Sequence, residues 1–263
     1  MIVVTGGAGF IGSAIVAELN ARGTSDILIV DDLGNDEKWK NLRRLRYADY
    51  IDKDRFIDTV REELLPVEVE AVIHMGACSS TSETDASYLV SNNFEYTQAL
   101  AEWAVKEDIR FIYASSAATY GDGSRGFSDD ERNLEMLIPL NMYGYSKHMF
   151  DLWAKRHGMF DRIVGLKYFN VYGPNEYHKA DMRSFVNKAF HQIREKKRAG
   201  LFKSYRPQYP DGGQKRDFIY VKDAVAMTLF FLENEDVTGL YNIGTGEART
   251  WNDLAAAVFA AMG

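Results

Sequence analysis

Residues 3–16 read "VVTGGAGFIGSAIV". An apolar run is followed by Gly6, Gly9 and Gly12, and these glycines lead into a helical pattern. Glycines at this spacing let the backbone turn sharply and approach a pyrophosphate, whose charge is met by amide groups at the helix N-terminus. The stretch therefore predicts a strand, a dinucleotide-binding loop and a helix.

The next apolar run, "ILIVDD", supports this interpretation because it ends in carboxylates. Asp31 and Asp32 follow the glycines by about twenty residues, where a carboxylate can bind the adenine ribose of a dinucleotide. The two carboxylates would repel a 2′-phosphate, whereas Lys38 and Lys53 could attract one. Charge alone therefore leaves the choice between NAD and NADP open.

The first two-thirds of the chain alternates short apolar runs with longer amphipathic segments. The expected strands are "MIVVTG", "ILIVDD", "AVIHMGA", "RFIYASS" and "IVGLKYFN". The expected helices between them are "IGSAIVAELNAR", "EYTQALAEWAVKE" and "YGYSKHMFDLWAKRH". This pattern is typical of a parallel sheet covered on both faces. We expect an α/β, doubly wound (Rossmann) fold with ligands at the carboxyl ends of the strands.

The regularity changes after about Pro174. Residues 203–215 are rich in turn formers and predict a loop, after which "DFIYV" predicts a strand. Asp223 is expected to cap the following helix, and Thr250 with Asp253 predicts a capping box ahead of the last one.

These changes suggest a division of the chain. We expect residues 1–173 and 216–243 to form the dinucleotide-binding domain. Residues 174–215 and 244–263 are expected to form a smaller C-terminal substrate lobe, which we predict to be incomplete.

Composition narrows the class of protein. The 263 residues are 46% hydrophobic with a net charge of −7, which allows a large core and gives a nucleic-acid partner no electrostatic support. The basic run at 194–198 is expected to be a solvated helix face. Cys78 is the single cysteine, no apolar run is long enough for a membrane span, and no signal peptide precedes the first strand. We expect a cytoplasmic protein with no membrane partner and no metal.

The segment "MYGYSK" at 142–147 offers two tyrosines near one lysine. Residues four apart share a helix face, so Tyr143 can meet Lys147 and Tyr145 cannot easily do so. The ammonium is expected to lower the pKa of Tyr143, and such a pair can remove a proton from an alcohol. Tyr145 is expected to be a packing residue.

The loop "YASSAATYG" places hydroxyls at the carboxyl end of a predicted strand. Ser115, Ser116 and Thr119 can hydrogen-bond a substrate alcohol or carbonyl. Combined with Tyr143 and Lys147, they supply what hydride transfer to a nicotinamide needs: a base, a cation and an oxygen-orienting donor.

Together with "FNVYGP" and "RDFIYV", these motifs resemble the extended short-chain dehydrogenase/reductase family over nearly the whole chain. Members act mainly on nucleotide sugars. Sugar dehydratases of the family carry an Asp-Glu pair where this chain has Ala117 and Ala118. The resemblance therefore favours epimerisation over water elimination.

Four further segments narrow the resemblance: "VDDLGNDEKWKNL", "HMGACSSTSETD", "VSNNFEYT" and "YFNVYGPNEYHK". They closely resemble one group within the family, the 6-epimerases of ADP-linked manno-heptose. This implies that tightly bound NADP takes a hydride from C6″, the ketone presents its other face, and the hydride returns. It also implies a homo-oligomer that supplies the heptose of the bacterial lipopolysaccharide core.

The resemblance assigns roles to individual residues. Tyr143 and Lys179 would be the two acid/base groups, Lys147 would hold the nicotinamide ribose, and Ser116 would orient the reacting oxygen. Besides the three glycines, the implied cofactor contacts are Phe10, Ile11, Asp31, Asp32, Lys38, Lys53, Met75, Gly76, Ala77, Cys78, Ser79, Asn92, Lys147, Val171 and Lys179. The implied substrate contacts are Ser116, Asn170, Asp181, Lys188, Phe202, Lys203, Ser204, Tyr205 and Arg216.

The chain departs from the group at several positions. Met75 replaces an acidic residue, while Asp181 and Lys188 replace a small residue and a histidine. The loop before Arg216 is also longer than usual. An epimerase or reductase of another nucleotide sugar therefore stays open. So does a protein of another class, either a non-catalytic dinucleotide-binding sensor or an inactive truncated product.

Overall fold

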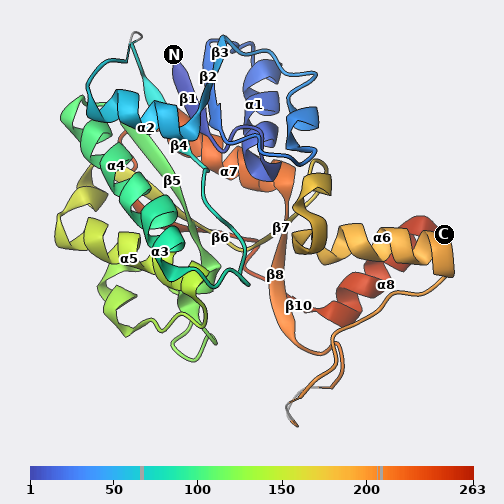
Figure 1. The fold of residues 1–263 in the computed structure, drawn as a ribbon. Helices are drawn as coiled ribbons and strands as arrows, with labels where there is room; N and C mark the ends of the chain where they lie inside the picture. The colour runs from blue at the N-terminus through green and yellow to red at the C-terminus, as the bar shows by residue number, and fades with distance from the viewer. Residues whose placement is uncertain (66–67, 206, 208–209) are drawn as a thin grey trace.

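A computed structural model describes residues 1–65, 68–205, 207 and 210–263 of the chain. Figure 1 shows a parallel sheet with helices on both faces, and a smaller lobe that carries α6, α8 and β10 beside it. The predicted doubly wound α/β fold is confirmed. Among the described residues, no helix is both long and apolar enough to cross a membrane.

The main sheet has seven parallel strands in the order β3-β2-β1-β4-β5-β6-β9. Their bounds are β1 Ile2–Thr5, β2 Ile27–Asp31, β3 Asp49–Asp52, β4 Ala71–His74, β5 Arg110–Ser116, β6 Ile163–Tyr168 and β9 Gly239–Ile243. The chain leaves β1 toward β2 and later returns on its other side at β4. This reversal makes the carboxyl ends of β1 and β4 the expected ligand site.

The sequence analysis did not predict β3 or β9 as strands. β3 reads "DYID" and lies at the sheet edge with no buried residue, so it lacks the apolar run that marked the central strands. β9 reads "GLYNI" and is buried at only two positions. Both are strands because of their neighbours in the sheet, which local sequence does not reveal.

Two layers of helices cover this sheet (Figure 1). On one face lie α1 Phe10–Ala21 and α7 Val221–Glu233, which contact each other; on the other lie α2 Lys53–Arg61, α4 Tyr96–Lys106 and α5 Met142–Arg156. Val3 is buried in the core under the second layer, whereas Val4 is buried under the first. Successive strand residues point to opposite faces, so a fully buried strand is apolar throughout.

The prediction that Asp223 caps α7 is wrong. The helix begins at Val221 directly after a strand, with Tyr220 as the N-cap, so Asp223 lies inside the first turn. A carboxylate there still interacts favourably with the helix dipole.

The lobe contains a second sheet, ordered β10-β8-β7, beside two packed helices. Its elements are β7 Asn170–Tyr172, β8 Lys215–Tyr220, β10 Ala248–Thr250, α6 Phe185–Lys196 and α8 Trp251–Met262. Ala189 and Ile193 of α6 pack on Val258 of α8. The strand predicted from "DFIYV" is confirmed as β8, and the capping box of Thr250 and Asp253 is confirmed at the start of α8.

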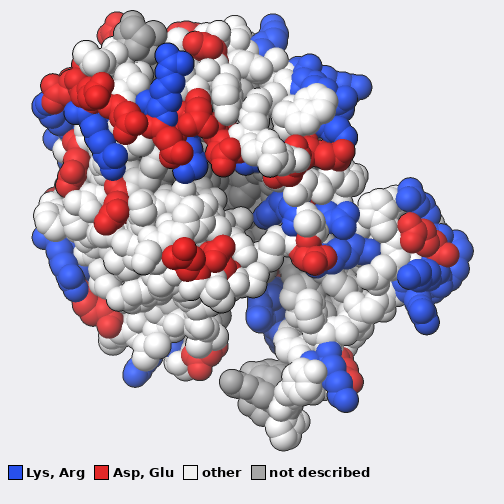
Figure 2. Space-filling view, viewed as in Figure 1, with Lys and Arg blue, Asp and Glu red and all other residues white. Residues whose placement is uncertain are grey.

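The surface of the lobe agrees with two further predictions. Residues 194–198 are all exposed, and Figure 2 shows basic side chains at the outer end of α6, so this run is a solvated face. The loop predicted at 203–215 has no helix or strand before Lys215 in its described part, while Arg206, Gln208 and Tyr209 lie outside the described residues.

Several short helical segments complete the fold. They are η1 Lys38–Asn41, α3 Ala86–Leu89, the π-helical η2 Val90–Glu95, η3 Ala117–Tyr120, η4 Glu131–Met136, η5 Met159–Asp161 and η6 Tyr177–Met182. Three of them lie in connections that leave the carboxyl ends of main strands, η1 after β2, η2 after β4 and η3 directly after β5, whereas η6 follows β7 of the second sheet.

Candidate active site

The loop between β1 and α1 needs its three glycines. Gly6 has a φ of +64°, a conformation that strains any other residue. A Cβ at Gly12 would lie 2.1 Å from the Gly6 carbonyl oxygen, and one at Gly9 would lie 3.0 Å from the same atom. Gly9 is the N-cap of α1 without a capping side chain, so the first amides of the helix remain open to a ligand. These features fit the pyrophosphate of a dinucleotide.

A cavity of about 480 Å³ lies beside this loop. Every predicted cofactor residue except Val171 lines it: Gly6, Gly9, Phe10, Ile11, Gly12, Asp31, Asp32, Lys38, Lys53, Met75, Gly76, Ala77, Cys78, Ser79, Asn92, Lys147 and Lys179. Val171 instead packs against the apolar clusters beneath α1 and α7. Segments that are far apart in the chain thus meet where the sheet order predicts a ligand.

Tyr143 and Lys147 both line the cavity from α5. The Lys147 ammonium donates to the Ala114 carbonyl oxygen at 2.7 Å, and burial lowers the pKa of Lys147 to about 8. Burial raises the pKa of Tyr143, which a hydrogen bond with the Ser116 side chain partly offsets. The expected lowering of the Tyr143 pKa is therefore wrong for this structure, because burial outweighs the favourable contact.

Tyr145 is not the packing residue that we expected, since 48% of it is exposed. It lies two residues from Tyr143, on a face of α5 that points away from the core. Both tyrosines lie on α5, but Tyr143 lines the cavity whereas Tyr145 is exposed to solvent.

Beneath the cavity, a polar network is fully buried. Asp151 of α5 pairs with Lys167 of β6 at 2.6 Å, and neither side chain is exposed. The Tyr113 hydroxyl and the Ser115 hydroxyl each donate to Asp151 at 2.8 Å, and Lys167 donates to the Thr119 hydroxyl at 2.7 Å. Thr119 lies outside the lining of the cavity, whereas Ser115 lines it while its hydroxyl donates to Asp151, so a substrate contact of Ser115 stays a prediction.

A second buried contact joins the loop at 75–79 to α5. Asn93 accepts from the Cys78 amide at 2.8 Å and donates to the Cys78 carbonyl oxygen and the Ser146 hydroxyl, each at 3.0 Å. The Ser146 hydroxyl donates to the Tyr143 carbonyl oxygen at 2.7 Å. Sequence analysis missed Asn93 and selected its neighbour Asn92, since nothing in the sequence tells which of two adjacent asparagines the π-helical turn directs inward.

Lys179 reaches the cavity from a different element, η6. Its ammonium lies 5.7 Å from the centre of the Phe10 ring, at the start of α1. Burial lowers the pKa of Lys179, and the nearby Glu176 carboxylate partly raises it. Glu176 is itself buried and accepts from the Ser184 hydroxyl at 2.6 Å. The structure therefore brings Tyr143 and Lys179 to one cavity from separate parts of the fold.

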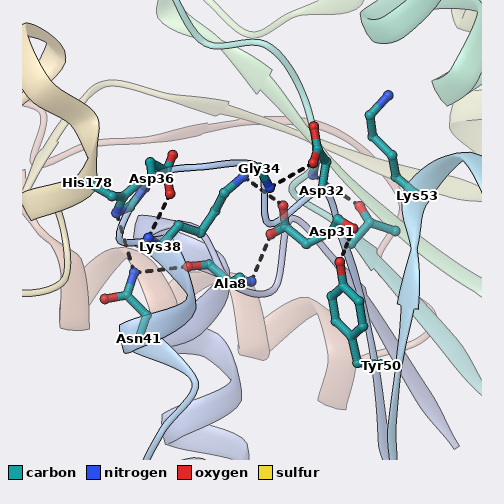
Figure 3. A network of polar contacts seen from close by, with 12 residues as sticks. Ala8, Asp31, Asp32, Gly34, Asp36, Lys38, Asn41, Tyr50, Lys53 and His178 are labelled. Carbon is teal, nitrogen blue, oxygen red and sulfur yellow. Dashed lines mark hydrogen bonds and ion pairs between the residues drawn. The ribbon is translucent and has the colours of Figure 1, made fainter.

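The carboxylate at the end of β2 is already engaged (Figure 3). Asp31 accepts from the Ala8 amide at 2.8 Å and pairs with Lys38 of η1 at 3.0 Å. Lys53 pairs with Asp54 at 2.9 Å and donates to the Asn92 side chain at 3.1 Å. Lys38 thus neutralises Asp31, one of the two carboxylates expected to repel a 2′-phosphate, whereas Asp32 accepts from the Gly34 amide.

None of the predicted substrate residues lines this cavity: Ser116, Asn170, Asp181, Lys188, Phe202, Lys203, Ser204, Tyr205 and Arg216 lie outside its lining. Lys188 donates to the Asp181 carbonyl oxygen, Phe202 contacts the Trp251 ring with centroids 5.0 Å apart, and Tyr205 is 91% exposed. Apart from Ser116, they belong to the lobe, in which Asn170 lies on β7 and Arg216 lies on β8.

Other residues line the cavity that were not expected from the sequence to contact a ligand: Thr5, Val30, Asp36, Ser80, Tyr88, Tyr96, Ala114, Tyr168, His178, Ala180 and Met182. Position at a strand's carboxyl end could have indicated Thr5 and Ala114. His178 could have been found as the neighbour of Lys179. Tyr88 and Tyr168 carry no local signal, because only the fold brings them there.

Comparison with known proteins gives consistent relatives. The NAD dependent epimerase/dehydratase family matches residues 2–244. An ADP-L-glycero-D-manno-heptose-6-epimerase of Nitratidesulfovibrio vulgaris is 58% identical over 262 residues, which cover 100% of this chain and 81% of the relative. An enzyme of the same name from Fusobacterium nucleatum is 51% identical over 99% of this chain and 80% of its own length.

Among solved structures, the fold is similar to that of the Helicobacter pylori ADP-L-glycero-D-manno-heptose-6-epimerase. The TM-score is 0.84 at 28% sequence identity, and the match covers 100% of this chain and 82% of that one. Both comparisons therefore give epimerases among the relatives.

Proposed function

The chain belongs to the NAD dependent epimerase/dehydratase family, and we propose that it converts ADP-D-glycero-D-manno-heptose to ADP-L-glycero-D-manno-heptose by inverting C6″. The observation that carries this proposal is the pairing of Tyr143 and Lys179, which line one cavity beside the glycine loop from different elements. Inversion takes a hydride from one face of C6″ and returns it to the other face. The hydroxyl proton must then be transferred in both orientations of the sugar, and we assign one acid/base group to each. The names of its relatives supply the substrate.

In this mechanism the chain handles the proton of the C6″ hydroxyl. The bound nicotinamide supplies the acceptor for the C6″ hydride and the source from which it returns. Lys179, whose pKa is lowered by burial, is suited to remove the hydroxyl proton, and Tyr143, whose pKa is raised, is suited to donate one to the ketone oxygen. Ser116, bonded to Tyr143, orients the oxygen, and Lys147 holds the nicotinamide ribose. The hydrogen that leaves as hydride and proton is restored, so there is no net redox change.

The cofactor we propose is NADP. Lys38 already neutralises Asp31, and Lys53 lines the same cavity as a second cation. These two ammonium groups could bind a 2′-phosphate, although the carboxylate of Asp32 also lines the cavity. Calorimetric titration with NADP⁺ and NAD⁺ tests this: Lys38→Ala should weaken NADP⁺ binding about tenfold more than NAD⁺ binding. Equal weakening of both would favour NAD.

Inversion is tested with purified protein and ADP-D-glycero-D-manno-heptose, following the C6″ configuration by NMR. We expect inversion by the parent protein, and Tyr143→Phe and Lys179→Met should each lower kcat by about 10²–10⁴-fold. Tyr145→Phe is the matched control, because it makes the same change on the same helix at an exposed residue and should keep full activity.

Two results would contradict the proposal in different ways. A dinucleotide-loaded protein that inverts no heptose would be a binding protein or would act on another nucleotide sugar, which a panel of ADP- and UDP-sugars separates. A fully active Lys179→Met variant would remove Lys179 from the chemistry while leaving the reaction in place.

We further propose that residues 174–215 and 244–263 bind the sugar, through Asn170, Asp181, Lys188, Arg216 and the segment 202–205 that flank or belong to them. The product would serve the lipopolysaccharide core, made in the cytoplasm, and the protein would act as a homo-oligomer. Light scattering on the purified protein tests the last point.

A further inference from the structure

Asn41, the last residue of η1, touches two parts of the site at once (Figure 3). Its side-chain amide donates to the Ala8 carbonyl oxygen at 2.9 Å and to the Asn175 carbonyl oxygen at 3.2 Å. The same nitrogen lies 3.5 Å from the His178 ring nitrogen. One side chain thus links the glycine loop to the segment that precedes Lys179.

On the glycine-loop side, Asn41 completes a closed set of contacts. The backbone of Ala8 is bonded on both sides: its amide donates to the Asp31 carboxylate, and its carbonyl oxygen accepts from Asn41. Asp31 is held in turn by Lys38, which lies on the same short helix as Asn41. The loop and η1 therefore form one fixed unit, and Asn41 projects from that unit toward η6.

On the other side, the segment around Lys179 has few anchors of its own. None of the six residues of η6 is buried, and Asn175 and Ala180 have positive φ values of 74° and 44°. Besides Asn41, the segment is tied by Asn175 to the Ser13 hydroxyl at 3.2 Å and by Glu176 to Ser184. It also contacts side chains of α6: Lys188 donates to the Asp181 carbonyl oxygen, and the Tyr177 ring lies 6.4 Å from that of His191. The loss of one anchor should therefore move Lys179 more than the loss of one contact would move a residue in the core.

We propose that Asn41 is a positioning residue that holds Lys179 against the dinucleotide-binding loop, and so sets the proton transfer on one face of the substrate. The proposal rests on the acid/base role of Lys179 proposed above. Asn41 lies outside the lining of the cavity, so it acts through the segment and not by touching the ligand.

The charges around Lys179 do not change when Asn41 is replaced. The Glu176 carboxylate is the charged group that raises the pKa of Lys179. His178, the residue before Lys179, interacts electrostatically with Asp31, Asp36 and Lys38. An Asn41 variant alters none of these groups. A change in the reactivity of Lys179 therefore reports a change in its position and burial.

The test is competitive acetylation of lysines with trace acetic anhydride across pH, read by mass spectrometry, which measures the apparent pKa of Lys179 without substrate. In Asn41→Ala the segment should loosen and the Lys179 amine should become hydrated. Its apparent pKa should then rise by about one unit toward the ordinary value of lysine. In the inversion assay, kcat should fall about tenfold or more while KM changes little, as expected for a misplaced group.

Asn20→Ala is the matched control. Asn20 also bridges two segments with its side chain, donating to the Thr24 carbonyl oxygen at 2.9 Å and the Arg46 carbonyl oxygen at 2.8 Å, but it makes no contact with the Lys179 segment. It should leave the acetylation of Lys179 unchanged. Should Asn41→Ala fail to fold, Asn41→Leu preserves the size of the side chain and removes its donor.

Unchanged acetylation of Lys179 in a folded Asn41 variant would overturn the proposal, and so would an equal change in Asn20→Ala. A raised Lys179 pKa in the Asn41 variant supports it even where the parent protein inverts no heptose. In that case the positioning role stands and the proposed function fails.

Discussion

The side of the cavity that carries Tyr143 is built from the interior of the domain, whereas the side that carries Lys179 is a short turn without a buried residue. α5 rests on the buried pair of Asp151 and Lys167, while η6 is tied by a few side chains such as Glu176. The two proposed acid/base groups therefore depend on the fold in different ways. Substitutions beneath Tyr143 should lower the free energy of unfolding, whereas substitutions around Lys179 should mainly change the rate of the reaction.

The largest effect is expected from Asp151→Ala. It leaves the Lys167 ammonium buried without its partner, which should lower the free energy of unfolding by about 3–5 kcal/mol. Urea unfolding followed by circular dichroism measures this. Glu135→Gln is the control, because it neutralises the half-exposed partner of Lys155 and should change stability by less than about 1 kcal/mol. A loss as small as that of the control would mean that the buried pair contributes little to the stability of the Tyr143 side.

A second prediction concerns the pH dependence of stability. Burial lowers the pKa of Lys147 to about 8 from a model-peptide value of 10.5, so the unfolded chain binds more protons between these pH values. The free energy of unfolding, taken relative to Lys147→Met, should therefore rise by about 3 kcal/mol from pH 8 to pH 10.5. Urea titrations of both proteins across this range provide the measurement. If the difference in the free energy of unfolding between the two proteins did not change with pH, Lys147 would be solvated. The contrast between the Tyr143 side and the Lys179 side would then weaken.

The smallest change in stability is expected on the other side, from Glu176→Gln. The substitution removes the carboxylate that raises the pKa of Lys179, so that pKa should fall and the corresponding limb of the pH–kcat profile should move to lower pH. Stability should change by only about 1 kcal/mol, because the amide retains part of the contact with Ser184. Glu195→Gln, on the exposed face of α6, should shift nothing. A stability loss as large as that of Asp151→Ala would remove the distinction between the two sides.

The sequence predicted the features that local chemistry determines. Helix spacing placed Tyr143 and Lys147 on one face of α5, and the pattern of Thr250 and Asp253 marked the start of α8. It failed where partners come from far along the chain. Edge strand β3 has no apolar run of its own. The Thr119 hydroxyl accepts a hydrogen bond from Lys167, which lies 48 residues further along the chain in β6. The proximity of Lys179 to the cavity followed from resemblance and not from any pattern in its neighbours.

The order of strands in the main sheet also has a consequence for how the chain is made. A ribosome releases β1 first, and β2 can pair with it soon afterwards, but the other edge of β1 waits for β4. β6 waits longer still, because its partner β9 begins at Gly239. An unpaired strand edge on a partly folded chain readily pairs with another chain. The outer edge of β6 is therefore the point at which a stalled or truncated nascent chain would begin to aggregate.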